Sequence, residues 1–152
     1  MKGRGTTATG RSKRKDQFVP IAYGMAHSPA WRSLTGSAVK VYIELRSRYN
    51  GGNNGRLTLS LDEGSRLLGL GKATVRRAFL ELETKGFVRR TKRGRWYGRL
   101  ASEYAVSDRS HDGLPPANSW SRWQPSESQK NSVSVLGRIR GRSDGGTMEP
   151  ER

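Results

Sequence analysis

The sequence predicts a mainly α domain with a small antiparallel β hairpin, and two observations carry this prediction. Residues 18–107 hold 22 of the 27 Leu, Ile, Val and Phe residues of the 152-residue chain. Within this segment the apolar spacing is first helical and later alternates as in strands. We therefore expect one folded domain over 18–107, a disordered basic arm over 1–17 and a mostly disordered polar tail over 108–152. Residues 118–125 of that tail could pack on the domain.

Two helices are predicted in the first half of the domain. Ser28 followed by Pro29 is typical of an N-cap with proline at the first helical position, which predicts a short helix to Leu34. Thr35 can cap the next helix, which ends at the Asn and Gly residues of 50–52. Its apolar stripe consists of Ala38, Val41, Tyr42, Leu45 and Tyr49. We expect four aromatic residues in the core, namely Trp31, Tyr42, Phe79 and Phe87.

A short strand and a third helix are expected next. The strand is predicted over 56–59 after a loop of Asn and Gly residues. Ser60 and Glu63 have the spacing of a capping box, which predicts the start of a helix there. We expect Leu67 and Leu68 on the buried side of this helix.

A fourth helix and a hairpin complete the domain. The Leu-Gly-Leu-Gly sequence at 68–71 ends the third helix, and the fourth ends at Gly86, where a left-handed cap belongs. The apolar stripe of the fourth helix consists of Val75, Ala78, Phe79 and Leu82. Two helices joined by a tight turn that contains Gly form a helix-turn-helix. Strands are predicted over 87–91 and 103–106, with Gly94 as the turn residue between them.

The net charge of +16 indicates an anionic partner. Ten Lys and Arg residues lie between 72 and 99, where only Glu81 and Glu83 are acidic. The arm carries six bases against one acid, whereas the tail is nearly neutral, with seven bases against six acids. Such a basic cluster in a folded segment is typical of nucleic-acid binding. A solvated surface that serves solubility is the alternative.

Several short motifs resemble a known family. They are Ser28-Pro29-Ala30-Trp31-Arg32, Asn53-Asn54-Gly55, Lys72-Ala73-Thr74-Val75-Arg76-Arg77-Ala78, Gly86-Phe87-Val88 and Trp120-Ser121-Arg122-Trp123. Over about residues 18–125 the chain resembles small winged-helix proteins of bacteria, phages and mobile elements, which are related to N-terminal domains of phage replication proteins. The sequence departs from the family pattern at Gly64 and Gly71, where Ala and Ser are usual. The resemblance implies a winged helix-turn-helix that binds DNA, with the hairpin as the wing.

Candidate DNA-binding residues follow from the helical geometry. The side of the fourth helix opposite its apolar stripe carries Ala73, Arg77, Leu80 and Thr84. The first residues of a recognition helix reach base edges in the major groove, which nominates Lys72, Ala73, Thr74, Arg76 and Arg77. Arg can bind guanine through two hydrogen bonds, and contact with phosphate alone is the alternative for both arginines.

The hairpin supplies a second group of candidates. Arg93 and Arg95 flank Gly94 at the predicted tip, and with Arg99 they suit a narrow minor groove or its phosphates. Trp96 and Tyr97 either pack on the hairpin, which is the usual arrangement, or stack on bases.

Other classes of function lack the residues they need. Without cysteine the chain has no disulfide, zinc-cysteine site or cysteine nucleophile. Gly71 and Lys72 resemble the end of a phosphate-binding loop. The motif fails because Ala73 stands where Ser or Thr is required and Arg66 stands where the first glycine is required. His27 and His111 are isolated, and Asp62, Glu63, Glu81 and Glu83 are interpreted as helix-dipole and surface charges. We therefore expect a DNA-binding protein that is not an enzyme and has no cofactor or metal.

The sequence leaves the biological use of DNA binding open. A transcriptional regulator is expected first, a replication initiator or accessory protein of a phage, plasmid or mobile element is the alternative, and a protein-interaction adaptor is a third. A homodimer, or a replication or transcription partner that contacts the tail, is compatible with all three. No secretory signal or membrane span is visible, so we expect the protein in the bacterial cytoplasm or nucleoid.

Overall fold

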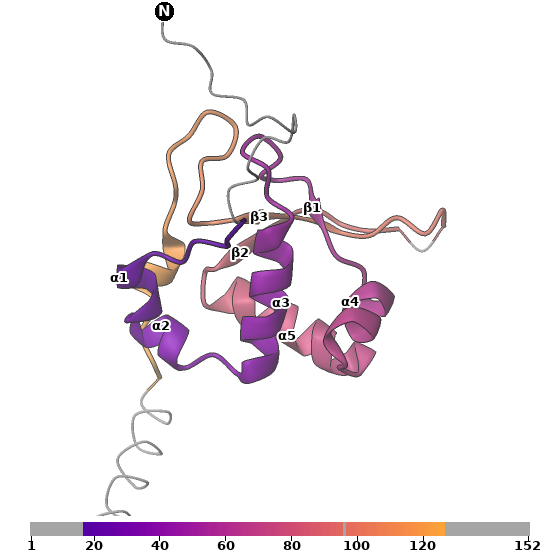
Figure 1. Cartoon of the computed structure of the whole chain (residues 1–152), viewed down its shortest axis with the longest axis horizontal. Coiled ribbons are helices and arrows are strands. Elements are labelled where there is room, and N and C mark those ends of the chain that lie inside the picture. The colour runs from indigo at the N-terminus through magenta and orange to yellow at the C-terminus, as the bar shows by residue number, and fades with distance from the viewer. Residues whose placement is uncertain (1–16, 96, 127–152) are drawn as a thin grey trace, which may run out of the picture.

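The computed structural model describes residues 17–95 and 97–126 (Figure 1). These residues form five α-helices, a three-stranded antiparallel sheet and one 3₁₀ turn, which confirms the prediction of a mainly α fold with a small antiparallel sheet. In chain order the elements are α1 (Tyr23–Ala26), α2 (Pro29–Arg32), α3 (Gly36–Ser47), β1 (Leu57–Thr58), α4 (Leu61–Leu68), α5 (Lys72–Thr84), β2 (Val88–Lys92), β3 (Glu103–Val106) and η1 (Ser119–Arg122). The predictions for residues 1–16 and 127–152 lie outside the described residues.

Hydroxyl side chains begin three of the helices as predicted. The hydroxyl of Ser28 accepts the backbone N–H of Trp31 at the start of α2. The hydroxyl of Thr35 accepts the N–H of Ala38 at the start of α3, and the hydroxyl of Ser60 accepts the N–H of Glu63 at the start of α4. Each bond satisfies a backbone donor that has no partner within its helix. The four-residue α1 was not predicted, because its N-cap residue is Ala22, which forms no side-chain cap.

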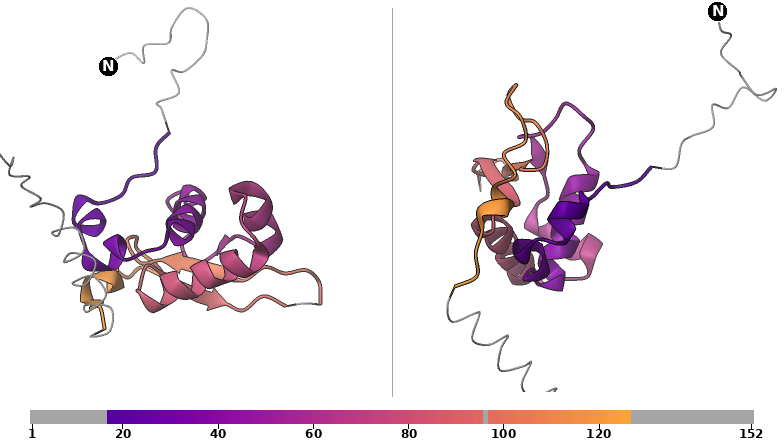
Figure 2. Two further views of the ribbon diagram at one scale, coloured as in Figure 1. Left: turned by 90° about the horizontal axis from the view of Figure 1, so that it is seen from below. Right: turned by 90° about the vertical axis from the view of Figure 1, so that its left-hand side faces the viewer.

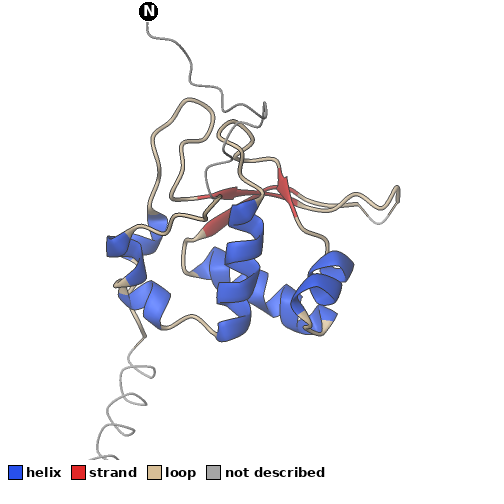
Figure 3. Ribbon diagram, in the orientation of Figure 1, coloured by secondary structure: helices blue, strands red, loops and turns tan. Residues whose placement is uncertain are grey.

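Helices α3, α4 and α5 lie on one side of the sheet (Figure 3), and aromatic residues meet in the core. Trp31 presents its ring at right angles to the rings of Tyr42 and Phe87, with centroids 5.5 and 5.7 Å away. Phe79 of α5 stacks on Tyr104 of β3 at 4.5 Å. All four predicted core aromatics therefore pack in the core, with Trp31 half-buried at its edge.

The strands are ordered β1, β3, β2, so that β3 is central. In β2 and β3, Arg89 lies opposite Ala105 and Arg90 lies opposite Tyr104. An irregularity between Arg90 and Lys92 shifts the register, so that Lys92 pairs with Glu103. The strand predicted over 56–59 is shorter than expected, because only Leu57 and Thr58 pair with β3.

Helix α4 approaches α5 through a glycine rather than through both leucines. Gly64 is its buried residue, and a Cβ there would lie only 3.0 Å from Cγ1 of Val75. Leu68, one turn later on the same side, is half-buried, whereas Leu67 is 47% exposed. The prediction that Leu67 is buried is wrong, because α4 is buried at Gly64 rather than at Leu67.

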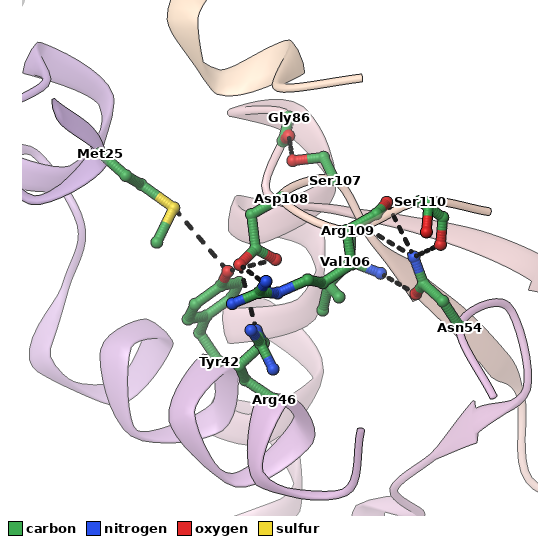
Figure 4. Close-up of polar contacts among 10 residues, drawn as sticks. All are labelled: Met25, Tyr42, Arg46, Asn54, Gly86, Val106, Ser107, Asp108, Arg109 and Ser110. Carbon is green, nitrogen blue, oxygen red and sulfur yellow. Dashed lines mark hydrogen bonds and ion pairs between the residues drawn. The ribbon is translucent and has the colours of Figure 1, made fainter. Parts of the chain in front are cut away.

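The packed part of the chain extends past the predicted boundary at residue 107. Asp108 accepts hydrogen bonds from the hydroxyl of Tyr42, at 3.2 Å, and from Nε of the buried Arg46, at 3.1 Å (Figure 4). Trp120 and Trp123 pack against the core as partly buried side chains. Contacts with the domain thus continue past residue 107 through Asp108, and Trp120 and Trp123 lie in the 118–125 segment that was expected to be able to pack on it.

Asn54 attaches the loop before β1 to the segment after β3. Its side-chain amide donates to the carbonyl groups of Val106, Arg109 and Ser110, and its Oδ1 accepts the N–H of Val106 (Figure 4). These contacts join parts of the chain that are more than 50 residues apart in sequence. The loop 50–56 and the segment after residue 107 are thus held together on the side of the sheet that faces away from α5.

Candidate nucleic-acid interface

The start of α5 presents a basic surface to solvent. Lys72, Ala73, Arg76 and Arg77 are exposed, and Thr74 is half-buried at the edge of this surface. The predicted apolar stripe on the other side of the helix is buried throughout. The five residues nominated on this helix therefore lie together on its solvent side, which continues to Leu80, at 50% exposure. We call Lys72, Ala73, Thr74, Arg76 and Arg77 the α5 surface.

The acidic residues of α5 are held away from the α5 surface. The carboxylate of Glu81 accepts hydrogen bonds from the backbone N–H and hydroxyl of Thr35 and from Nζ of Lys85. Burial alone would raise the pKa of Glu81, but these hydrogen bonds outweigh it and the pKa is lowered. Glu83 lies 3.7 Å from Nε of Arg90. The interpretation of Glu81 as a surface charge is therefore wrong, because it joins α5 to the start of α3.

Lys85 does not belong to the basic surface although it lies in the basic segment of the sequence. It is 8% exposed, and its Nζ donates to the carbonyl of Ser33 at 2.7 Å and to Glu81 at 2.8 Å. Lys72 is paired with Asp62 of α4, but both side chains are largely exposed, so water and salt weaken this pair. Arg76 and Arg77 form no ion pair within the described part of the chain.

The turn between α4 and α5 is short and glycine-rich. Gly69 caps α4 with φ +64°, a left-handed conformation that glycine adopts without strain. Gly71 then serves as the N-cap of α5 and provides no side-chain acceptor for the backbone N–H groups of the first turn. Such a helix start favours the approach of an anion to the α5 surface.

The hairpin carries Arg93, Arg95 and Arg99, all exposed. It projects beyond the helices at the end of the molecule where α4 and the start of α5 lie, as Figure 1 and the left view of Figure 2 show. The predicted hairpin arginines and the α5 surface are thus carried on one end of the molecule. We call Arg93, Arg95 and Arg99 the hairpin arginines.

The hairpin turns at a different glycine from the one predicted. Arg95 pairs with Leu100, so the turn lies between these two residues, with φ +90° at Gly98 and +52° at Arg99. Gly94 lies in the paired arm, where a Cβ would be 2.5 Å from the carbonyl oxygen of Leu100. The prediction of Gly94 as the turn residue is wrong, because its missing side chain permits a close approach of the two arms instead.

The aromatic residues at the tip were expected to pack on the hairpin as the usual arrangement. Tyr97 is 89% exposed and extends into solvent, so it does not pack there. Trp96 lies outside the described residues.

Each of the two histidines contacts neighbouring residues of the fold. His27 stacks on the exposed ring of Tyr23, and His111 lies against Gly55 and Arg89. Among residues 17–95 and 97–126 no three acidic or histidine side chains are grouped so that they could hold a metal ion. No helix in the same residues is both long and apolar enough to cross a membrane.

Comparisons of the chain with protein-family models, with curated proteins and with solved structures find no match. The candidate interface is therefore described by its own geometry: an exposed basic helix start, a projecting basic hairpin and two helices joined by a three-residue turn.

Proposed function

We propose that this chain is a winged-helix protein that binds double-stranded DNA at specific sites, as a transcriptional regulator does. In this proposal α4 and α5 form the helix-turn-helix, α5 is the recognition helix and the hairpin of β2 and β3 is the wing. The α5 surface enters the major groove, where Arg76 or Arg77 contacts base edges and Lys72 contacts phosphate. The hairpin arginines reach an adjacent minor groove or its phosphates.

The separation of charge on α5 is the observation that carries this proposal. Both acidic residues of the helix contact neighbouring elements of the fold, Glu81 through Thr35 and Lys85 and Glu83 through Arg90. Arg76 and Arg77 remain exposed. A surface that served only solubility would need a modest charge of mixed sign. A helix whose basic side chains are exposed and whose acidic side chains are paired within the fold favours binding to a polyanion.

The exposed tip of the hairpin gives independent support. A hairpin that served only to close the domain would gain nothing from three exposed arginines on an arm that extends past the helices. Phosphate contacts from such an arm fix the position of a protein on a duplex, and base contacts from the recognition helix give specificity. A protein-interaction adaptor would have no use for this arrangement of charge.

Binding to duplex DNA is tested by titration at several salt concentrations. Each neutralised phosphate steepens the dependence of log K on log salt by about 0.9, so we expect a strong salt dependence for the wild type. Arg76→Ala with Arg77→Ala should weaken binding and reduce the slope. Arg32→Ala, a change of an exposed arginine at the end of α2, is the matched control and should leave both unchanged. A flat slope in the wild type, or no binding at low salt, would contradict the proposal.

Selection of preferred sites from random duplexes, followed by a genome-wide footprint, tests the regulatory use. A transcriptional regulator should protect sites at promoters. The alternative, a replication initiator or accessory protein of a mobile element, should protect repeated sites at an origin.

A further inference from the structure

A cleft of about 910 Å³ lies between the loop before β1 and the segment after β3, which are on the side of the sheet that faces away from α5 (Figure 1). One wall is the glycine-rich loop 51–56, and the other is the segment 110–113. Residues 89–92 of β2 and Glu103 of β3 line it between these walls. The side-chain amide of Asn54 joins these two walls through hydrogen bonds to the carbonyl groups of Arg109 and Ser110 (Figure 4), which holds the cleft in shape. We call this feature the outer cleft.

The alternation of side chains along β2 determines which residues face the outer cleft. Arg90 lies opposite Tyr104, which stacks on Phe79 of α5, so this pair is directed toward the helices. Arg89 lies opposite Ala105 and is directed to the other side. There its Nη2 lies 3.1 Å from Nδ1 of His111. Consecutive arginines therefore give the hairpin positive charge on both of its faces.

The outer cleft carries an excess of positive charge. Lys92 is balanced by Glu103, at 3.4 Å across the two strands. Asp112 lies 3.3 Å from His111 and is 79% exposed at the rim. Arg56 is exposed and forms no ion pair among the described residues, and Arg89 is held by an imidazole ring rather than by a carboxylate. Two guanidinium groups thus lie on the cleft without an acidic partner.

The walls of the outer cleft are fixed by direct contacts. The hydroxyl of Thr91 donates to the carbonyl of Gly55 at 2.5 Å. A Cβ at Gly55 would be 2.1 Å from Nε2 of His111, so only glycine permits the ring to lie against the loop. Because the glycines of both walls have no side chains, the backbone borders the cleft directly. A preorganised cleft loses little conformational entropy when a ligand enters it.

The geometry points to the outer cleft as a binding site for the phosphodiester backbone of a second nucleic-acid segment. A guanidinium forms two parallel hydrogen bonds with a phosphate, and both unpaired groups of the cleft are of this type. Among the described residues no tryptophan, tyrosine or phenylalanine lines the cleft, so it offers phosphate contacts rather than an apolar pocket. A duplex on the α5 surface lies on the other side of the sheet and does not fill the cleft. That this segment is the second one bound rests on the proposed function, whereas the phosphate site itself does not.

The test uses the full chain and a short oligonucleotide of arbitrary sequence, either single-stranded or as a duplex. Arg76→Ala with Arg77→Ala removes the arginines of the α5 surface, and we expect this variant to keep part of its binding at low salt. Adding Arg56→Ala should weaken the remaining binding by about tenfold or more, because the charged hydrogen bonds that a guanidinium forms with phosphate are stronger than neutral ones. The slope of log K against log salt should fall by about 0.7 for the single strand or about 0.9 for the duplex.

Adding Arg32→Ala instead of Arg56→Ala is the matched control, and it should leave the remaining binding unchanged. Because Arg56 is exposed, its removal should not affect folding, and equal melting temperatures would verify this. A loss caused by Arg56→Ala on either oligonucleotide supports the outer cleft and identifies which form it prefers. Equal binding by the Arg56→Ala and Arg32→Ala variants on both oligonucleotides would overturn it. If the α5 changes have no effect but Arg56→Ala does, the proposed function fails while the cleft remains a phosphate site.

Discussion

The carboxylate of Glu81 accepts both the backbone N–H and the hydroxyl of Thr35, at 3.1 and 2.7 Å. Thr35 is also the N-cap of α3, where its hydroxyl oxygen accepts the N–H of Ala38. The same carboxylate binds Nζ of the buried Lys85. One side chain of α5 therefore completes the start of α3 and balances a buried charge, which fixes α5 to the rest of the domain.

Glu81→Gln should destabilise the protein in a pH-dependent way. The hydrogen bonds favour the ionised form, so the pKa of Glu81 is lowered in the folded state. Its contribution is fully present above the unfolded pKa of about 4.3 and is lost as the pH falls through the lower folded pKa. We expect a cost of about 1.5 to 3 kcal/mol at neutral pH, measured by urea unfolding. The difference between variant and wild type should shrink below about pH 4. A difference that is the same at pH 3 and pH 7 would contradict this role.

Asp108→Ala should be among the most destabilising changes in the chain. Asp108 is the counter-charge of Arg46, which is 3% exposed and has no other acidic partner among the described residues. Removing one partner of a buried ion pair costs about 3 to 5 kcal/mol, because the other charge stays buried. Thermal unfolding measures the effect. Asp112→Asn is the control and should change stability by less than about 0.5 kcal/mol, because it removes an exposed carboxylate and asparagine tolerates the φ of +51° at this position.

A chain of residues 17–126 should unfold at the same temperature as a chain of residues 17–152. A chain of residues 17–107 should unfold at a much lower temperature. The shorter chain lacks Asp108 and the two tryptophans, Trp120 and Trp123, that pack on the core. Trp123 also lies 5.2 Å from Nζ of Lys85, in cation–π geometry. Equal melting temperatures for the two truncated chains would show that the segment after 107 adds nothing to stability.

Local patterns predicted four of the five helices, α2 to α5, because caps and apolar stripes involve residues three or four positions apart. Ser28, Thr35 and Ser60 each bind a backbone N–H within one turn, so their role is visible in the sequence. The roles of Glu81 and Asp108 depend on partners 46 and 62 residues away, Thr35 and Arg46. Nothing in the local sequence distinguishes these acids from surface charges.

Part of the candidate site was likewise predictable from local patterns, and part of it was not. The solvent side of α5 follows from a period of 3.6 residues, so its exposed residues were predictable. The hairpin tip was not, since Gly94 and Gly98 are equally typical of turns and only the pairing of Arg95 with Leu100 selects Gly98. The outer cleft was not predicted either. Arg56 and Arg89 belong to different strands and loops, and only the order of the strands brings them to one cleft.

Arg77→Ala should weaken binding to the preferred DNA site more than binding to random duplex, by about 1 to 3 kcal/mol. Arg77 lies on the α5 surface, opposite the buried stripe, where a recognition helix contacts base edges. Arg95→Ala should weaken both to a similar extent, because Arg95 lies on the projecting hairpin and is expected to contact the backbone or minor groove. Both side chains are exposed, so neither change should alter the unfolding temperature.

The measurement is the ratio of the dissociation constant for random duplex to that for the preferred site, at a single salt concentration. Arg32→Ala is the control and should leave this ratio unchanged. A change of 1.4 kcal/mol corresponds to about tenfold in the ratio. Equal losses on both DNAs for Arg77→Ala would assign Arg77 to phosphate and move sequence recognition elsewhere on the α5 surface. Arg76→Ala would then be the next variant to compare, because Arg76 is also exposed at the start of α5 and forms no ion pair in the described part of the chain.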